Sequence, residues 1–474
     1  MSDTAVDPTP TVTLRPARPW WPRLRDARRP LPRVLGVDAA RGLAVVGMIV
    51  AHSVTDRAFG EDPAGLLGFS HGRSSILFAT VAGVALAIMS GGSRPPEGEE
   101  LLRVRLRLLG RAIALMGFAA ILSLIPTPIS VILASYAFWF VLALPALTWR
   151  PRTLLIVAAC HALFGQLLTV MTSTWFVEWG RPYANGTSFV PEMLASSVFP
   201  AFVWMSFVLA GMALGRYGLD NIASLRVFLA TGLVMFIAFA APFLIEARSL
   251  APLFGQGEKG FPTPSVSSNV LPSDFPTDPL CLTEDNTQLV PCTQEESEQQ
   301  LKTMTPEQWE ALDTLINQKL GIDPSEGSGS WDPGSMPGGS GSSDGKIIDL
   351  SQPINWKAVL WTLTPHSGSP FEVLSSGGLA LATIAGLVLL GRVRWSRFVL
   401  FPLIGIGSMA LTAYMAHVLV IQSLRDHVLD LHLALGLSLG LIILCALWKQ
   451  VFTSGPLEQM TGALADRLAG HPKR

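Results

Sequence analysis

The sequence predicts an all-α fold: a polytopic integral membrane helix bundle of about ten transmembrane helices, with both termini in the cytoplasm. Of the 474 residues, 49% are hydrophobic and only 15% are charged, and the mean hydropathy is +0.42. An ordinary soluble domain of this length carries more charge. The formal net charge of −1 and the lack of a basic domain give no indication of nucleic-acid binding.

Apolar stretches long enough, or nearly long enough, to cross a bilayer recur along the chain. They cover residues 35–55, 72–91, 108–125, 131–148, 153–172, 197–215, 227–246, 372–391, 398–422 and 433–450. Basic residues, mostly Arg, occupy every second loop between these stretches and the N-terminal tail. Because positive charge favours the cytoplasmic side, this alternation places both termini in the cytoplasm.

The polar and apolar segments divide the chain into five parts. Residues 1–34 form a cytoplasmic Arg-rich tail, and residues 35–246 form a first membrane part of about seven spans. Residues 247–370 form an extracytoplasmic polar insertion with a flexible Gly/Ser-rich linker. Residues 371–450 form a second membrane part of about three spans, and residues 451–474 form a cytoplasmic tail.

The four cysteines divide by location. Cys281 and Cys292 lie in the polar insertion, where an oxidising compartment permits a disulfide between them. Cys160 and Cys445 lie in apolar stretches and are expected to be packing residues. No His lies near Cys281 or Cys292, so no metal site is expected there.

The first span contains a polar pattern formed by Asp38, Arg41 and His52. Arg41 and His52 are separated by three helical turns plus about 20°, so they share one stripe of the helix, about 16 Å apart. Asp38 precedes Arg41 by one turn and can pair with it. Because a charge at the centre of a span costs about 3 kcal/mol, such residues usually face a protein interior. The pattern predicts a polar track from the cytosolic third of the helix toward the outer leaflet.

Most histidines are predicted to lie at or near the outer face, including His52, His71, His366 and His417. Histidine is the side chain best matched to proton transfer near neutral pH. His52 and His71 are therefore the candidate catalytic bases, and Arg41, held by Asp38, would stabilise charge in the track. The alternative is that these histidines simply sit at the membrane interface.

Five further residues are candidates for binding a substrate. Arg73 follows His71 closely and could orient an acceptor. His366 and Glu372 flank a Gly/Pro-rich turn placed directly before a span, where they would line the outer mouth of the site. Tyr414 and His417 are three residues apart and share a helix face. An interhelical hydrogen bond that stabilises the bundle is the alternative for this pair.

The cytosolic loop after the second span contains Arg103, Arg105 and Arg107. Guanidinium groups bind phosphates well, so these residues could hold an anionic nucleotide donor. The bias of positive charge toward the cytoplasm explains the same residues without any ligand.

Several segments resemble those of a known family. The first span, Leu35 to His52, resembles the opening of the heparan-α-glucosaminide N-acetyltransferase-like membrane proteins. That group includes bacterial proteins of the YeiB type, a family defined by a domain of unknown function. Other similar segments are Phe199–Arg216, Pro365–Gly368 with Gly377-Gly378, Gly407–Thr412 with His417, and Gly455–Glu458. The resemblance covers most of the membrane part but not residues 255–350, and the spacing from Arg41 to His52 is also that of acyltransferase-3 membrane enzymes.

The resemblance implies acyl transfer across a membrane. A cytosolic acyl-CoA, in the simplest case acetyl-CoA, would be the co-substrate, and a sugar or glycolipid of the cell envelope would accept the acyl group. A histidine would act as general base or transient acyl carrier. The eukaryotic members have their catalytic His several residues before a Gly, whereas His71 directly precedes Gly72, and they tend to have Asn where this chain has His52.

We therefore expect a multi-pass protein of a bacterial plasma membrane whose partners are membrane lipids and an envelope glycan, with a homodimer as an open option. A transporter or lipid flippase could use the same intramembrane polar residues as a translocation path. A third reading is an envelope scaffold that acts through the polar insertion. Binding of CoA would separate an acyltransferase from a transporter.

Overall fold

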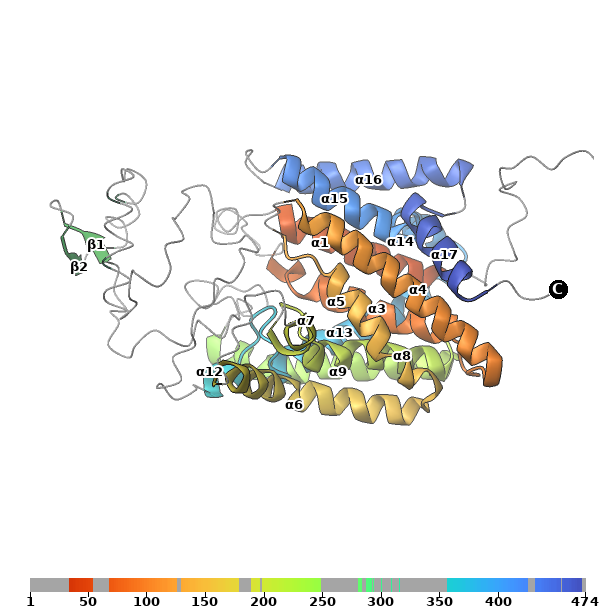
Figure 1. Cartoon of the computed structure of the whole chain (residues 1–474), viewed down its shortest axis with the longest axis horizontal. Coiled ribbons are helices and arrows are strands. Elements are labelled where there is room, and N and C mark those ends of the chain that lie inside the picture. Colours follow the sequence, from red (N-terminus) through yellow and green to blue (C-terminus); the bar gives the residue numbers. More distant parts are fainter. Residues whose placement is uncertain are drawn as a thin grey trace, which may run out of the picture. The chain divides into compact units, whose positions relative to one another are not determined.

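The computed structural model describes residues 34–53, 68–125, 129–178, 189–196, 198–248, 280–283, 287–291, 293, 300, 308, 315, 356–424, 431–452 and 454–470. These residues form an almost entirely helical membrane bundle (Figure 1). The all-α prediction is confirmed for this part of the chain. The linker at residues 327–345 and Cys292 lie outside the described residues.

Long helices make up the bundle. They are α1 (Leu35–Ser53), α3 (Arg73–Met89), α4 (Gly98–Ser123), α5 (Leu133–Leu142), α6 (Pro151–Glu178), α8 (Ala201–Tyr217), α9 (Ile222–Ala247), α13 (Pro370–Leu390), α14 (Ser396–Gly407), α15 (Ala410–Ser423), α16 (Leu431–Val451) and α17 (Pro456–Leu468).

Shorter elements join or flank these helices. They are the 3-10 helices η1 (Gly68–Ser70) and η2 (Pro145–Thr148), the single turns α7 (Phe189–Pro191) and α12 (Trp356–Leu360), the π-helical turn η4 (Glu192–Ser196), and the strands β1 (Leu280–Leu282) and β2 (Leu289–Pro291). The two strands pair antiparallel, with Cys281 opposite Val290. Cys281 is disulfide-bonded, and the pairing with Cys292 stays a prediction.

Among the described residues, 7 helices are long and apolar enough to cross a membrane. An eighth crossing would combine α14 and α15, which bend by 70° at their junction. The other two predicted stretches fall on the shorter apolar helices α5 and α8. With 10 residues, α5 is only about half as long as the hydrocarbon layer is thick. The count of about ten spans and the position of the termini stay predictions.

The two membrane parts fold onto each other around α1. This helix packs against α3 from the first part and against α13, α14 and α16 from the second. The crossing with α14 is close enough to require glycine: a Cβ on Gly42 would lie 2.0 Å from the carbonyl oxygen of Leu403. The contact brings the N-terminal span directly against segments more than 300 residues later in the chain.

The end of α8 is fixed by a buried cation. Arg216 is 4% exposed, and its guanidinium donates to the carbonyl oxygen and to the hydroxyl of Ser90, at 2.9 and 2.7 Å. It also donates to the carbonyl oxygen of Leu147. Arg216 therefore ties α8 to the ends of α3 and η2, in addition to any effect on topology as a loop cation.

The break between α14 and α15 is closed by two charged side chains. Arg41 donates from Nη1 to the carbonyl oxygen of Gly407, at 3.3 Å. Glu458 accepts hydrogen bonds from the backbone N–H groups of Leu411 and Thr412, at 2.7 and 3.1 Å, and from the Thr412 hydroxyl, at 2.6 Å. Helix ends leave carbonyl and N–H groups unsatisfied, and these contacts pair them. Glu458 belongs to α17, so the predicted C-terminal tail contains a helix that packs against α4 and α15.

Candidate active site

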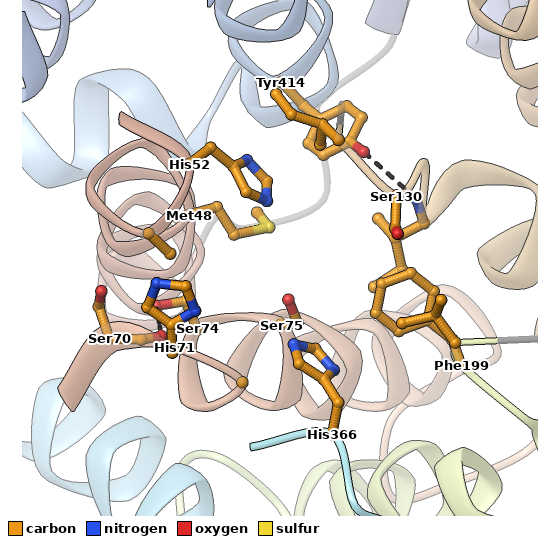
Figure 2. A pocket seen from close by; sticks show the side chains of 15 residues that line it. Met48, His52, Ser70, His71, Ser74, Ser75, Ser130, Phe199, His366 and Tyr414 are labelled. Atoms are coloured by element: carbon orange, nitrogen blue, oxygen red, sulfur yellow. Dashed lines mark hydrogen bonds between the residues drawn. The ribbon is translucent and has the colours of Figure 1, made fainter. Parts of the chain in front are cut away.

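A cavity of about 190 Å³ lies among the end of α1, the start of α3, the loop before α13, and α15. Three histidines from three separate segments line it: His52, His71 and His366. Their rings point toward the same space (Figure 2). The other polar lining consists of Ser70, Ser74, Ser75, Ser130 and Tyr414. The apolar side chains in contact with the cavity include Met48 and Phe199. The site thus combines imidazoles and hydroxyls within an apolar bundle.

His52 is paired with a second histidine behind it. Its Nδ1 lies 3.2 Å from Nε2 of His417, and the two rings are stacked, with 5.4 Å between centroids and 5° between planes. One of the two facing nitrogens must carry the shared proton, because two lone pairs or two N–H groups would repel. This contact occupies Nδ1 and leaves Nε2 of His52 as the nitrogen available to the cavity.

His417 therefore does not line an outer mouth, as the sequence suggested. It is fully buried, at 0% exposed, behind His52. Tyr414 contacts its ring edge to face, with 5.1 Å between centroids, as their spacing on one helix predicts. The Tyr414 hydroxyl accepts from the backbone N–H of Ile132, at 3.3 Å. Tyr414 therefore joins α15 to the loop that forms the opposite wall of the cavity (Figure 2).

The turns that present His71 and His366 pack against each other. Gly72 has a φ of 65°, in the left-handed region. A Cβ at this position would lie 3.1 Å from Cβ of Pro365 and 3.4 Å from Oε1 of Glu372. Glycine is therefore needed both for the backbone conformation and for the close approach. The result is that two histidines far apart in the sequence face one cavity.

His366 also has a left-handed backbone, with a φ of 63°. Its ring stacks on Trp204, at 6.0 Å between centroids, and meets Phe199 edge to face, at 5.6 Å. Burial lowers the pKa of His366 to about 4, and His71 nearby adds to this effect. The imidazole is therefore neutral at physiological pH and can both donate and accept a hydrogen bond.

Glu372 and Arg73 lie behind the cavity wall rather than along it. Glu372 is 4% exposed and accepts hydrogen bonds from the turn around His366. Arg73 donates to the carbonyl oxygen of Phe69, at 3.2 Å, and its guanidinium lies 4.5 Å from the centre of the Phe69 ring. Both residues were expected to contact substrate. In this structure they support the residues that do line the cavity.

Asp38 and Arg41 form the ion pair that their spacing predicts, with 2.9 Å between Oδ1 and Nη1. Neither is among the residues that line the cavity. The polar stripe of α1 therefore has two separate functions. Its first half closes the end of α14 through Arg41, and its second half brings His52 to the cavity.

The three candidate donor-binding arginines lie on α4, away from the cavity lining. Arg103 pairs with Glu99 at 3.1 Å, and Arg107 pairs with Asp466 of α17 at 3.4 Å. Arg103 and Arg107 are exposed, and Arg105 is partly buried. Their role in binding a donor stays a prediction. No group of three or more His, Cys, Asp or Glu side chains within the described part of the chain is placed to hold a metal ion.

The fold and the cavity define a multi-pass helical membrane protein with an enclosed histidine site. Residues 33–241 match the family described as "Heparan-alpha-glucosaminide N-acetyltransferase, catalytic", and residues 348–467 match the family described as "Protein of unknown function (DUF418)". The first membrane part thus belongs to the acetyltransferase catalytic family and the second to the DUF418 family, which confirms the resemblance seen in the sequence. Comparison with curated proteins and with solved structures gave no match.

The cavity is built from both matched regions. His52, His71 and Phe199 come from the first, while His366 and Tyr414 come from the second. Sequence reasoning missed the serines and the wall around Ser130, because hydroxyl residues in an apolar stretch carry no distinctive pattern. The adjacent pair Ser74-Ser75, directly after Arg73, was the one available signal.

Proposed function

We propose that the protein is a transmembrane acyltransferase of a bacterial plasma membrane. It moves an acyl group, in the simplest case acetyl, from a cytosolic acyl-CoA to an extracytoplasmic sugar or glycolipid of the cell envelope. The observation that carries this proposal is the convergence of His52, His71 and His366 on one cavity, in a region matched by an acetyltransferase catalytic family.

The reaction requires a base for the acceptor. The amine or hydroxyl of the acceptor attacks the thioester carbonyl, and Nε2 of His52 removes its proton. The bond between carbon and sulfur breaks, and the CoA thiolate leaves with the electron pair and takes up a proton. The products are acylated acceptor and free CoA. His417 supports His52 in this role because its contact with Nδ1 fixes which nitrogen carries a proton. His71, on the same cavity, is the second candidate base.

The size of the cavity favours a small acyl group. At about 190 Å³, it is only slightly larger than the roughly 150 Å³ cavity that accommodates a benzene molecule in an engineered protein. The acyl group, the sulfur and the reacting group of the acceptor fill such a space. The rest of the CoA and the rest of the acceptor must lie outside it, which is consistent with a site that a donor and an acceptor reach from different sides.

A transporter remains the second candidate, because broken helices are typical of transporter binding sites. The 70° break between α14 and α15 is such a feature. However, Arg41 and Glu458 from the chain itself already pair with the broken ends. The break therefore offers no vacant backbone groups at these contacts for a transported ion.

The test is acetyl transfer by purified protein in detergent, using acetyl-CoA with a radiolabelled acetyl group and methyl α-D-glucosaminide as the acceptor probe. An envelope glycolipid extract serves as a second acceptor. Wild type is compared with His52→Ala and His71→Ala, and with His432→Ala as a histidine that does not line the cavity. Loss of transfer in His52→Ala, with transfer retained in His432→Ala, supports the proposal. Failure of wild type to bind acetyl-CoA favours the transporter.

A further inference from the structure

His366 is the clearest backbone outlier near the cavity. Among the described residues, only it and Arg248 are non-glycine residues with a positive φ. The left-handed region crowds Cβ against the backbone, so a histidine remains there only when its surroundings hold it. Arg248 lies at the end of α9, where a left-handed cap is common. His366 has no such ordinary reason, and it lines the cavity.

The carboxylate of Glu372 holds this turn. Oε1 accepts from the backbone N–H of His366, at 2.7 Å. Oε2 accepts from the backbone N–H of Gly368, at 2.8 Å, and from the hydroxyl of Ser367, at 3.0 Å. The backbone N–H of Glu372 in turn donates to the hydroxyl of Ser369, at 3.1 Å. All these contacts need acceptor oxygens on Glu372, which a carboxamide would offer only in part.

The imidazole that this turn presents has an unused polar atom. Nδ1 of His366 is buried and has no hydrogen-bond partner among the described residues. The hydroxyls of Ser75 and Ser130 also line the cavity, and Figure 2 shows both near the His366 ring side of the space. A buried polar atom without a partner is costly, so a ligand group that pairs with it would bind favourably.

We infer that Glu372 is a positioning residue that holds His366 in its left-handed conformation, so that the His366 ring hydrogen-bonds the amine or hydroxyl of the acceptor. The inference rests on the proposed function, because it assigns the acceptor to this cavity. Glu372 itself does not line the cavity and acts through His366. Arg73, which interacts electrostatically with Glu372, favours the carboxylate that the turn requires.

The experiment measures equilibrium binding of radiolabelled methyl α-D-glucosaminide and of acetyl-CoA to the full-length protein in lipid nanodiscs. We expect His366→Ala and Glu372→Gln each to raise the Kd of the sugar about tenfold, the loss of a good hydrogen bond. The Kd of acetyl-CoA should change less than about twofold. The double variant should bind the sugar no more weakly than either single variant, because both changes remove one interaction.

Glu458→Gln is the matched control. Glu458 also accepts from two backbone N–H groups and one hydroxyl, but it holds the start of α15 rather than the His366 turn. Its substitution should leave the Kd of the sugar within about twofold of wild type while it lowers stability in the same way. If Glu372→Gln does not fold, Ser367→Ala removes one of the Glu372 contacts, and we expect a Kd increase of about threefold.

Three results would overturn the inference: no binding of the sugar to wild type, a normal Kd in Glu372→Gln, or additive effects in the double variant. An acetyl-transfer assay on the same samples separates this inference from the proposed function. Sugar binding that depends on His366 and Glu372, without any acetyl transfer, would leave the inference standing and refute the acyltransferase. Transfer by wild type with unchanged sugar binding in both variants would do the reverse.

Discussion

Nδ1 of His52 lies 3.2 Å from Nε2 of His417, and the two rings are parallel. The pair joins the first span to a helix from the other membrane part. One histidine faces the cavity while the other is fully buried behind it. This arrangement gives His52 a defined protonation pattern without adding a charge to the bundle, because a neutral histidine can supply or accept the shared proton.

The first prediction concerns His417. Replacing it with Phe keeps an aromatic ring but removes the contact with Nδ1 of His52, so the tautomer of His52 is no longer fixed. General base catalysis contributes about 10²–10⁴-fold to a rate, and we expect kcat for acetyl transfer to fall by roughly tenfold to a hundredfold of that range. Steady-state kinetics provide the measurement. Unchanged kcat in His417→Phe, with His52→Ala inactive, would show that the pair has no catalytic role.

The second prediction concerns Gly72. A methyl group at this position meets Pro365 at 3.1 Å and forces a side chain into a φ of 65°. We expect Gly72→Ala to lower the free energy of unfolding by about 1–3 kcal/mol and to lower the Tm in detergent. Gly117→Ala is the control, because a Cβ on Gly117 meets no atom within 4 Å. That exposed helical position should be unaffected or slightly stabilised. Equal Tm values for the two variants would contradict the packing of the two turns.

The third prediction concerns pH. Burial lowers the pKa of His366 from 6.5 to about 4 in the folded protein. The unfolded chain therefore takes up a proton on this residue at a higher pH than the folded protein does. Stability must fall as the pH decreases from about 6.5 to about 4. His366→Gln lacks this loss, so its Tm should rise relative to wild type across that window. A constant difference in Tm between pH 7 and pH 4 would show that His366 is not buried as described.

The fourth prediction concerns Asp38 and Arg41. Arg41→Ala leaves a mostly buried carboxylate without its partner and removes the contact with Gly407. Because both side chains retain some exposure, we expect a loss of about 1–3 kcal/mol. The double variant with Asp38→Ala should recover part of that loss, since no charge is left unpaired. Thermal unfolding of the two single variants and the double variant measures the coupling. Strict additivity would contradict a structural ion pair.

Sequence patterns predicted the parts of this structure that depend on local spacing. Helical periodicity placed Asp38 one turn from Arg41, and it placed Tyr414 and His417 on one face. Topology alone predicted that His52, His71 and His366 would lie near the same face of the membrane, and the structure brings all three to one cavity. The matches to the two families agree with the segments quoted from the sequence.

Features that depend on contacts between distant segments could not be predicted. His417 lies behind His52 because α15 packs against α1, and no local pattern encodes this contact. Glu372 looked like a substrate-binding residue because its acidic side chain lies next to His366, yet it is occupied by the turn before its own helix. Arg216 read as a loop cation and is instead buried. The bend between α14 and α15 depends on Glu458 of α17, a helix in what read as a polar tail.

The most direct test of the account is a sided transfer assay in proteoliposomes. Acetyl-CoA with a labelled acetyl group is supplied on one side of the membrane, and methyl α-D-glucosaminide is enclosed on the other. The account predicts labelled sugar in the acceptor compartment for wild type and none for His52→Ala, although that variant still binds acetyl-CoA. Equal labelling by wild type and His52→Ala would contradict the assignment of the cavity as the acyl-transfer site.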